Sequence, residues 1–100
     1  MIMPIVLRSA QAEEDPIGIW SYVARENPAA ADRLLDRIEQ RWELTATQPR
    51  IGIARDDIGT DIRSIVIGEY LTFYRAIADG IEVMRILHGR REIQQAYFDF

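Results

Sequence analysis

Apolar residues recur at helical spacing in the first half of the chain. The first such stripe consists of Ala12, Ile19, Trp20 and Val23. Ser9 suits the cap position of a helix that carries this stripe, because its hydroxyl can accept from a free backbone N–H of the first turn. Pro16 and Gly18 interrupt the stripe, and Asp15-Pro16 could itself be a cap followed by a first-turn proline. The pattern therefore predicts a helix that either kinks at Pro16 or begins there.

A second amphipathic stretch begins at Asn27-Pro28, where Asn27 is expected to cap a helix and Pro28 to be its first residue. The predicted helix runs to about Thr47, and Pro49 ends it. Its apolar face consists of Ala31, Leu34, Leu35, Ile38 and Trp42. The connection to the first helix is very short, so the two helices should form an antiparallel hairpin.

Short runs rich in β-branched, aromatic and leucine residues predict strands on both sides of the helices. These runs are Ile5 to Arg8, Ile62 to Ile67, Tyr70 to Ala76 and Ile81 to Leu87. Gly68-Glu69 and Asp79-Gly80 are turn signals between the last three, and Gln48 to Asp61 is expected to be a loop. The order predicts one α+β domain over residues 1–100, β-α-α-β-β-β, with an antiparallel sheet packed against the two-helix hairpin.

The last strands lack a clearly polar face. Strict alternation would divide the final strand into two sets, Ile81, Val83, Arg85 and Leu87 against Glu82, Met84, Ile86 and His88. Two helices can cover only one face of the sheet, so we expect a partner to cover part of the other. Residues 91–100 are expected to form a short helix or an extended tail.

Composition narrows the classes of function. The net charge of −4 argues against a protein that coats nucleic acid, and we expect no specific DNA binding by the chain alone. The absence of cysteine and the single histidine argue against disulfides, metal sites and cofactors. No apolar run is long enough to cross a bilayer, so a cytoplasmic location is expected.

Arginine supplies all twelve basic residues, and there is no lysine. Arg33, Arg37 and Arg41 follow one another four residues apart on the second predicted helix. Their simplest interpretation is a solvated face balanced by three acidic neighbours, Asp32, Asp36 and Glu39. A second cluster, His88-Gly-Arg90-Arg91, stands at the end of the final strand. It could hold a nucleic acid, an acidic protein or a scissile phosphate.

The chain resembles the ParE branch of the RelE/ParE toxin superfamily over nearly its whole length. The matching segments are Ala12 and Asp15 followed by Ile19 to Tyr22, Asn27 to Ala31, Gln48-Pro49 with Gly52, Ile62 to Ser64, Gly68 to Arg75, and Ile81 to Arg91. Each segment alone is weak, and their order and spacing make the combination specific. The chain departs from the family pattern at Pro16 and at Ile53.

The resemblance implies the toxin of a type II toxin–antitoxin system, neutralised by a ParD-like antitoxin. ParE-like members of the superfamily poison DNA gyrase, whereas RelE-like members are ribosome-dependent mRNA endoribonucleases. A ribonuclease of this kind needs a base, cations that stabilise the phosphorane, and an acid. The candidates here are His88, Arg63, Arg85 and Tyr97. The lack of lysine and the acidic charge favour a non-enzymatic gyrase inhibitor, with the ribonuclease as the alternative.

Candidate contacts divide between target and antitoxin. For the target, we expect contacts from the end of the chain, at Arg90, Arg91, Tyr97 and Phe98. For the antitoxin, we expect a helix along the first two helices and an extended segment near the sheet edge, with contacts at Trp20, Arg63, Tyr74, Arg75 and Arg85. Structural roles compete with these expectations. The aromatic residues could belong to the core, His88 could donate to a carbonyl, and Arg75 and Arg85 could form ion pairs with Asp61, Glu69 or Glu82.

Overall fold

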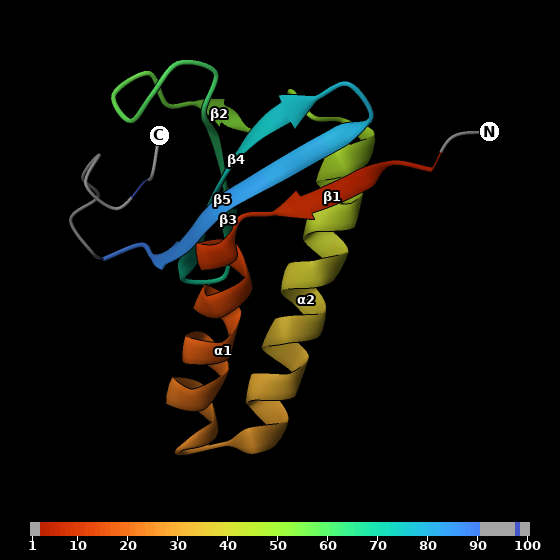
Figure 1. The fold of residues 1–100 in the computed structure, drawn as a ribbon. Coiled ribbons are helices and arrows are strands. Elements are labelled where there is room, and N and C mark those ends of the chain that lie inside the picture. Colours follow the sequence, from red (N-terminus) through yellow and green to blue (C-terminus); the bar gives the residue numbers. More distant parts are fainter. Residues whose placement is uncertain (1–2, 91–97, 99–100) are drawn as a thin grey trace.

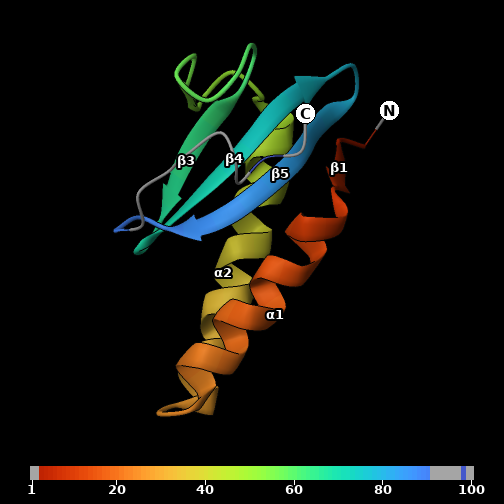
Figure 2. The same ribbon diagram turned by 60° about the vertical axis from the view of Figure 1, so that its left-hand side comes forward.

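The computed structural model describes residues 3–90 and Phe98. Its elements are β1 (Ile5–Arg8), α1 (Ala10–Ala24), α2 (Pro28–Thr47), β2 (Ile53–Ala54), β3 (Arg63–Ile67), β4 (Tyr70–Ile77) and β5 (Gly80–His88). The two helices run antiparallel on one face of the sheet, and their connecting turn projects well beyond it (Figures 1 and 2). The predicted α+β class and the order of its main elements are confirmed.

The five strands form one sheet in the order β1-β5-β4-β3-β2. The predicted antiparallel arrangement holds from β2 through β5. The sheet as a whole is mixed, because β1 pairs parallel with β5, from Ile5 opposite Gly80 to Arg8 opposite Val83. Strand β2 lies inside the predicted loop, since two paired residues carry too little pattern to be recognised.

Both helices begin at their predicted caps. Ser9 Oγ accepts from the Ala12 N–H at 3.0 Å, and Asn27 Oδ1 accepts from the Ala30 N–H at 3.0 Å. Helix α1 then continues through Pro16 to Ala24, so the prediction that it begins at Pro16 is wrong. Because Ser9 caps the helix, Asp15 is not its cap, and the Asp15 side chain is available for another role.

The main core lies between the helix hairpin and the sheet. Its largest fully buried side chains from the helices are Ile38 and Trp42 of α2. The Trp42 indole Nε1–H donates to Thr72 Oγ1 on β4 at 2.9 Å, so a buried polar pair satisfies itself inside this core. This bond fixes α2 over the middle of the sheet, and the expected core role of Trp42 is confirmed.

Strand β5 contains a bulge opposite β4. Phe73 pairs with Arg85 and Tyr74 with Val83, so Met84 has no partner across the ladder. The extra residue moves every later side chain to the opposite face. Consequently the core under the helices takes Ile81, Val83 and Ile86 from β5, and the other face takes Met84 and Leu87. The strict alternation predicted from the sequence is therefore wrong beyond Met84.

The sheet face away from the helices is covered largely by the chain itself. Ile58 and Ile62, from the loop between β2 and β3, pack there with Phe73, Leu87 and Phe98. The Phe98 ring meets Phe73 edge to face, with 5.1 Å between the ring centroids. The centre of this face therefore needs no partner. What stays exposed lies toward the edges, at Ile5, Leu7 and Val66.

Candidate functional site

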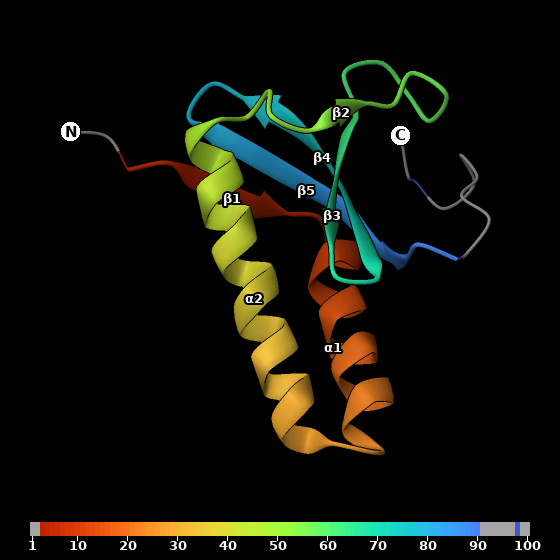
Figure 3. The same cartoon turned by 180° about the vertical axis from the view of Figure 1, so that it is seen from behind.

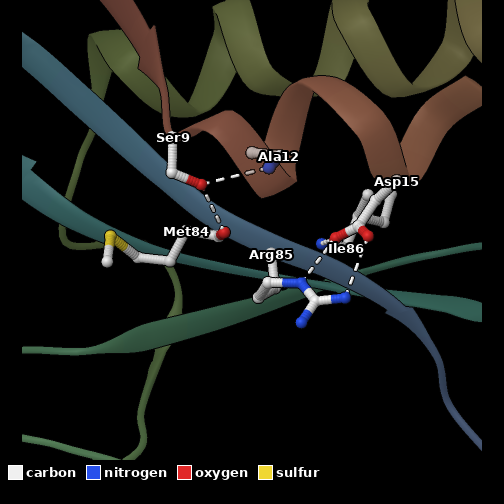
Figure 4. A network of polar contacts seen from close by, with 6 residues as sticks. All are labelled: Ser9, Ala12, Asp15, Met84, Arg85 and Ile86. Carbon is white, nitrogen blue, oxygen red and sulfur yellow. Dashed lines mark hydrogen bonds and ion pairs between the residues drawn. The ribbon is translucent and has the colours of Figure 1, made fainter. Parts of the chain in front are cut away.

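Side chains of α1 complete the edge of β5 at the point where β1 ends. The Ser9 backbone N–H donates to the Val83 carbonyl at 3.0 Å, and the Ser9 hydroxyl donates to the Met84 carbonyl at 2.7 Å (Figure 4). Asp15 Oδ2 then accepts the Ile86 N–H at 3.0 Å. Two helix side chains thus satisfy backbone groups that a longer β1 would have paired.

Asp15 and Arg85 form a two-point ion pair beside this edge (Figure 4). Arg85 Nε lies 2.8 Å from Asp15 Oδ2 and Nη2 lies 2.9 Å from Oδ1. Each side chain is only 14% exposed. The sequence suggested an ion pair for Arg85, but Asp61, Glu69 and Glu82 were the wrong partners. Arg85 is therefore a structural cation that locks α1 to β5.

An open groove of about 1020 Å³ runs between α1, α2 and the ends of β4 and β5. Its floor is apolar and consists of Ile19, Val23, Leu34, Tyr70 and Ile86. Its rim is polar and contains Glu14, Tyr22, Glu69, His88 and Arg90. Burial raises the pKa of Tyr70, and the charge of Glu69 adds to this. An apolar floor with a charged rim is typical of a protein-binding groove.

Gly18 leaves space along this groove. A Cβ atom built on Gly18 would meet no other atom within 4 Å, apart from its neighbours in the chain and its own helix backbone. The exposed side chains of Ile17 and Tyr22 flank it on α1. The groove wall at this point therefore consists of exposed helix backbone that a partner can approach closely.

His88 stands at the groove rim with a structural partner. Its Nδ1 accepts the Arg90 backbone N–H at 3.1 Å, and its ring packs edge to face on Tyr70 with 5.2 Å between centroids. Its Nε2 lies 3.7 Å from a Glu69 carboxylate oxygen. The structural role predicted for His88 is supported with a different bond, because the ring accepts from the backbone instead of donating to a carbonyl.

Tyr74 and Arg63 hold the segment that leaves α2. The Tyr74 hydroxyl donates to the Pro49 carbonyl at 2.8 Å and accepts the Gly52 N–H at 2.9 Å. Arg63 Nη1 donates to the Gly52 carbonyl at 2.8 Å. Burial raises the pKa of Tyr74, against smaller opposing effects of the Gly52 bond and the Arg63 charge. Tyr74 is fully buried, so the prediction that it contacts an antitoxin is wrong and its predicted core role is confirmed.

The other predicted contacts lie apart from one another. Arg75 is exposed and pairs with Glu82, as predicted, with 2.6 Å between Nε and Oε1. Trp20 is partly exposed, and its indole donates to Asp32 at 2.8 Å. Phe98 is buried in the second cluster, so its predicted role in target contact is wrong. Arg91 and Tyr97 lie outside the described residues.

The ribonuclease candidates do not converge within the described part of the chain. Arg63 pairs with Tyr74 in the ladder, and His88 pairs with Tyr70. Tyr70 and Tyr74 are four positions apart on β4, which is about 13 Å at the usual rise of a strand. Arg85 is committed to Asp15. A phosphoryl site needs its base and cations around one atom, and these three side chains do not provide that arrangement.

The sequence did not identify Asp15 as the partner of Arg85. The available signal was the position of Asp15, three residues after Ala12 and four before Ile19, which places a carboxylate on the buried side of α1, where it needs a partner. Among the described residues no group of three acidic or histidine side chains could hold a metal ion. Neither α1 nor α2 is long and apolar enough to cross a membrane.

Known proteins resemble this chain over most of its length. The family model described as "ParE toxin of type II toxin-antitoxin system, parDE" matches residues 6–93. Toxin ParE1 of Mycobacterium tuberculosis is 33% identical over 88 residues, covering 87% of this chain and 89% of that protein. Toxin ParE3 of Caulobacter vibrioides is 26% identical over 89 residues, covering 88% and 89%.

A solved structure supports the fold. The chain superimposes on a protein from the structure titled "Chromosomal ParDE TA system from P. aeruginosa" with a TM-score of 0.71. The match covers 86% of this chain and 96% of the other, at 18% sequence identity. The helix hairpin and the sheet are therefore an arrangement shared with that protein.

Proposed function

The chain belongs to the ParE toxin family of type II toxin–antitoxin systems, and from this premise we propose that it inhibits DNA gyrase by binding and is neutralised by a ParD-like antitoxin. One observation favours binding over catalysis. The cations and the histidine that a ribonuclease would use are engaged separately, with Arg85 on Asp15, Arg63 on a backbone carbonyl, and His88 on the Arg90 N–H.

The groove between α1, α2 and the sheet is the site we propose for an antitoxin helix. Its apolar floor suits the apolar stripe of an amphipathic helix, and its charged rim suits the polar flanks. Trp20 does not line this groove, but it is partly exposed on another side of α1 and stays a proposed antitoxin contact there. Arg75 and Arg63 stay within the proposed antitoxin contacts, at other parts of the sheet. Arg85 contributes to antitoxin binding indirectly, because its ion pair with Asp15 holds α1 against β5.

Target contact is proposed at the end of β5. Arg90 is exposed at the groove rim, directly after Gly89. Among the described residues no carboxylate pairs with its guanidinium, which suits a carboxylate or phosphate of the target. Arg91 and Tyr97 complete the proposed contact. If antitoxin and gyrase both use this rim, antitoxin binding would exclude gyrase sterically, which would explain neutralisation.

Purified protein tests the target directly. We expect it to inhibit gyrase supercoiling and to accumulate cleaved DNA, and Arg90→Glu to weaken both effects. Unchanged supercoiling and cleavage at saturating toxin would refute gyrase as the target. Ribosome-dependent cutting of mRNA that is lost in His88→Ala would support the ribonuclease instead. Unaffected growth after induction without an antitoxin would indicate an interaction module without toxicity.

A bulky residue at Gly18 tests the groove. Gly18→Trp should weaken antitoxin binding by about tenfold or more, because the side chain fills space that a partner helix would use. Ser21→Trp is the matched control, since Ser21 is exposed on the same helix and does not line the groove. Equal binding by both variants would place the antitoxin elsewhere.

A further inference from the structure

Helix α2 has a basic flank with no ion pair. Arg33, Arg37 and Arg41 are exposed and stand four residues apart, so they line one side of the helix. In the described part of the chain none of them pairs with a carboxylate. The acidic residues of α2 occupy the other side, at Asp32, Asp36, Glu39 and Glu43. The predicted balance between these charges is therefore absent.

Contacts on both sides show which way each flank of α2 faces. Glu39 lies 3.8 Å from Arg8 of β1, and Asp32 accepts from Trp20 of α1, so the acidic side faces β1 and α1. On the opposite side, Arg37 Nη1 lies 3.6 Å from the position of a Cβ built on Gly68. The basic flank therefore lies beside the turn between β3 and β4. Figure 3 views the molecule from the side on which α2 and β3 lie.

The outer edge of β3 is open beside this flank. Strand β2 pairs only with Arg63 and Ser64, and the Arg55 N–H donates to the Ile62 carbonyl on the same edge. Alternate residues of a strand direct their backbone groups to the same edge, so Val66 presents its N–H and C=O there. Within the described residues no strand pairs with these groups, and the Val66 side chain is 60% exposed.

Helix α2 runs along the strands next to this edge. Trp42 donates to Thr72, which pairs with Ile65 of β3, and five residues earlier Arg37 lies beside Gly68. Arginines four residues apart on a helix repeat every ~6 Å. Alternate residues of a strand repeat every ~6.8 Å. The two repeats are similar, so alternate side chains of a strand added beside Val66 match the spacing of neighbouring arginines on α2.

We propose that the β3 edge and the basic flank of α2 together bind an extended acidic peptide segment of a partner protein. The open N–H and C=O of Val66 can form hydrogen bonds with the backbone of an added strand, which a peptide provides and a nucleic acid does not. The unpaired arginines would bind carboxylates of this peptide, on the side of the sheet that faces α2. The intervening residues would lie beside the exposed Val66 side chain, so the expected segment alternates acidic and apolar residues.

This surface adjoins the groove at Gly68, which lines the groove and lies beside Arg37. Its test does not require toxicity. The probe is a fluorescein-labelled peptide that alternates Glu and Val, flanked by Gly-Ser for solubility. Fluorescence anisotropy should detect saturable, salt-sensitive binding. Arg37→Gln and Arg41→Gln should each weaken it about tenfold, whereas Arg25→Gln, at the exposed end of α1, should leave it unchanged. Unfolding curves establish that each variant is folded.

Chemical changes to the peptide test strand pairing without altering the protein. Two versions carry N-methyl groups, each on one alternate set of amides. Only the version methylated on the set that faces β3 should lose binding, because the other set faces solvent. The proposal is overturned if both versions bind like the parent, or if the arginine variants bind as well as the unmodified chain. Binding of single-stranded DNA with the same arginine dependence, and no peptide binding, would also overturn it.

Discussion

Asp15 and Arg85 lie 70 residues apart in sequence and meet through two hydrogen bonds of 2.8 and 2.9 Å. The same carboxylate accepts the Ile86 N–H. The Asp15 side chain therefore pairs with a largely buried cation and accepts from a backbone donor on β5. These bonds hold α1 against β5, and both Asp15 and Ile86 line the groove.

Removing the charge of Asp15 should destabilise the fold strongly. Asp15→Asn removes the charge that Asp15 sets against the Arg85 guanidinium, at a site where both side chains are 14% exposed. We expect a loss of about 2–4 kcal/mol of unfolding free energy, measured by chemical denaturation. The matched control is Glu82→Gln, which breaks the exposed pair with Arg75 and should cost less than about 1 kcal/mol. Equal losses for the two variants would contradict the structural role of Asp15.

Tyr74 should limit stability in alkali. Its pKa is raised in the folded state, so above the ordinary value of 10.0 the unfolded chain releases a proton that the folded chain keeps. Stability is therefore full below pH 10 and falls as the pH rises through the folded pKa. Tyr74→Phe should cost about 1–3 kcal/mol at pH 7, because it leaves Gly52 N–H and the Pro49 carbonyl unpaired.

The pH profile of Tyr74→Phe provides the decisive comparison. The chain contains no lysine and no cysteine, so tyrosines are the side chains expected to titrate near pH 10. The decline of stability above pH 10 should be shallower in Tyr74→Phe than in the unmodified chain. Parallel profiles would show that Tyr74 does not contribute to the alkaline loss.

Two glycines should respond in opposite directions to alanine. Gly18→Ala should stabilise the chain by about 0.5–1 kcal/mol, because Gly18 is inside α1 and a Cβ meets open space. Gly80→Ala should destabilise it, since the new Cβ would clash with the Ile5 carbonyl oxygen in the β1–β5 pair. Thermal unfolding distinguishes them, and a destabilised Gly18→Ala would contradict the open space.

Replacing the histidine should leave toxicity intact. In His88→Gln the amide oxygen can still accept the Arg90 N–H, while the imidazole that could serve as a base is removed. We expect gyrase inhibition within about twofold of the unmodified chain, since no proton transfer is involved. A loss of activity of more than about tenfold in a folded variant would point to a catalytic imidazole, because general acid–base catalysis accelerates reactions by about 10²–10⁴-fold.

Phe98 should contribute to stability as a core residue. Its ring covers Phe73 on the sheet face away from the helices, and it is only 7% exposed. Phe98→Ala should cost about 3 kcal/mol and increase binding of a dye that reports apolar surface. The control is Ile53→Ala, which truncates a residue that is 71% exposed and should cost little.

The features that the sequence predicted well depend on neighbouring residues. Ser9 and Asn27 cap their helices through bonds three residues away, and Asp79-Gly80 turns the last hairpin, so local chemistry was sufficient. The bulge at Met84 was missed because it arises from a register between strands and from the distant Ser9 hydroxyl.

The candidate site was harder to predict for the same reason. Whether Arg85 serves a partner or the fold is decided by Asp15, on another element 70 residues away. Likewise, Tyr74 and Phe98 are apolar enough to suit an interface or a core, and only the packing of the loop and sheet shows that both are buried. A single sequence lists the available side chains without showing which of them are already engaged.

The position of β5 also determines when the molecule can fold. This last strand lies between β1 and β4, so the first strand made during synthesis has no neighbour in the sheet until the final hairpin has left the ribosome. The helix hairpin can form earlier, but its apolar side chains are not fully buried until β5 packs against them. A nascent chain that stops before Gly80 should therefore remain open to proteases, because β1 and the helix hairpin lack the strand that they pack against.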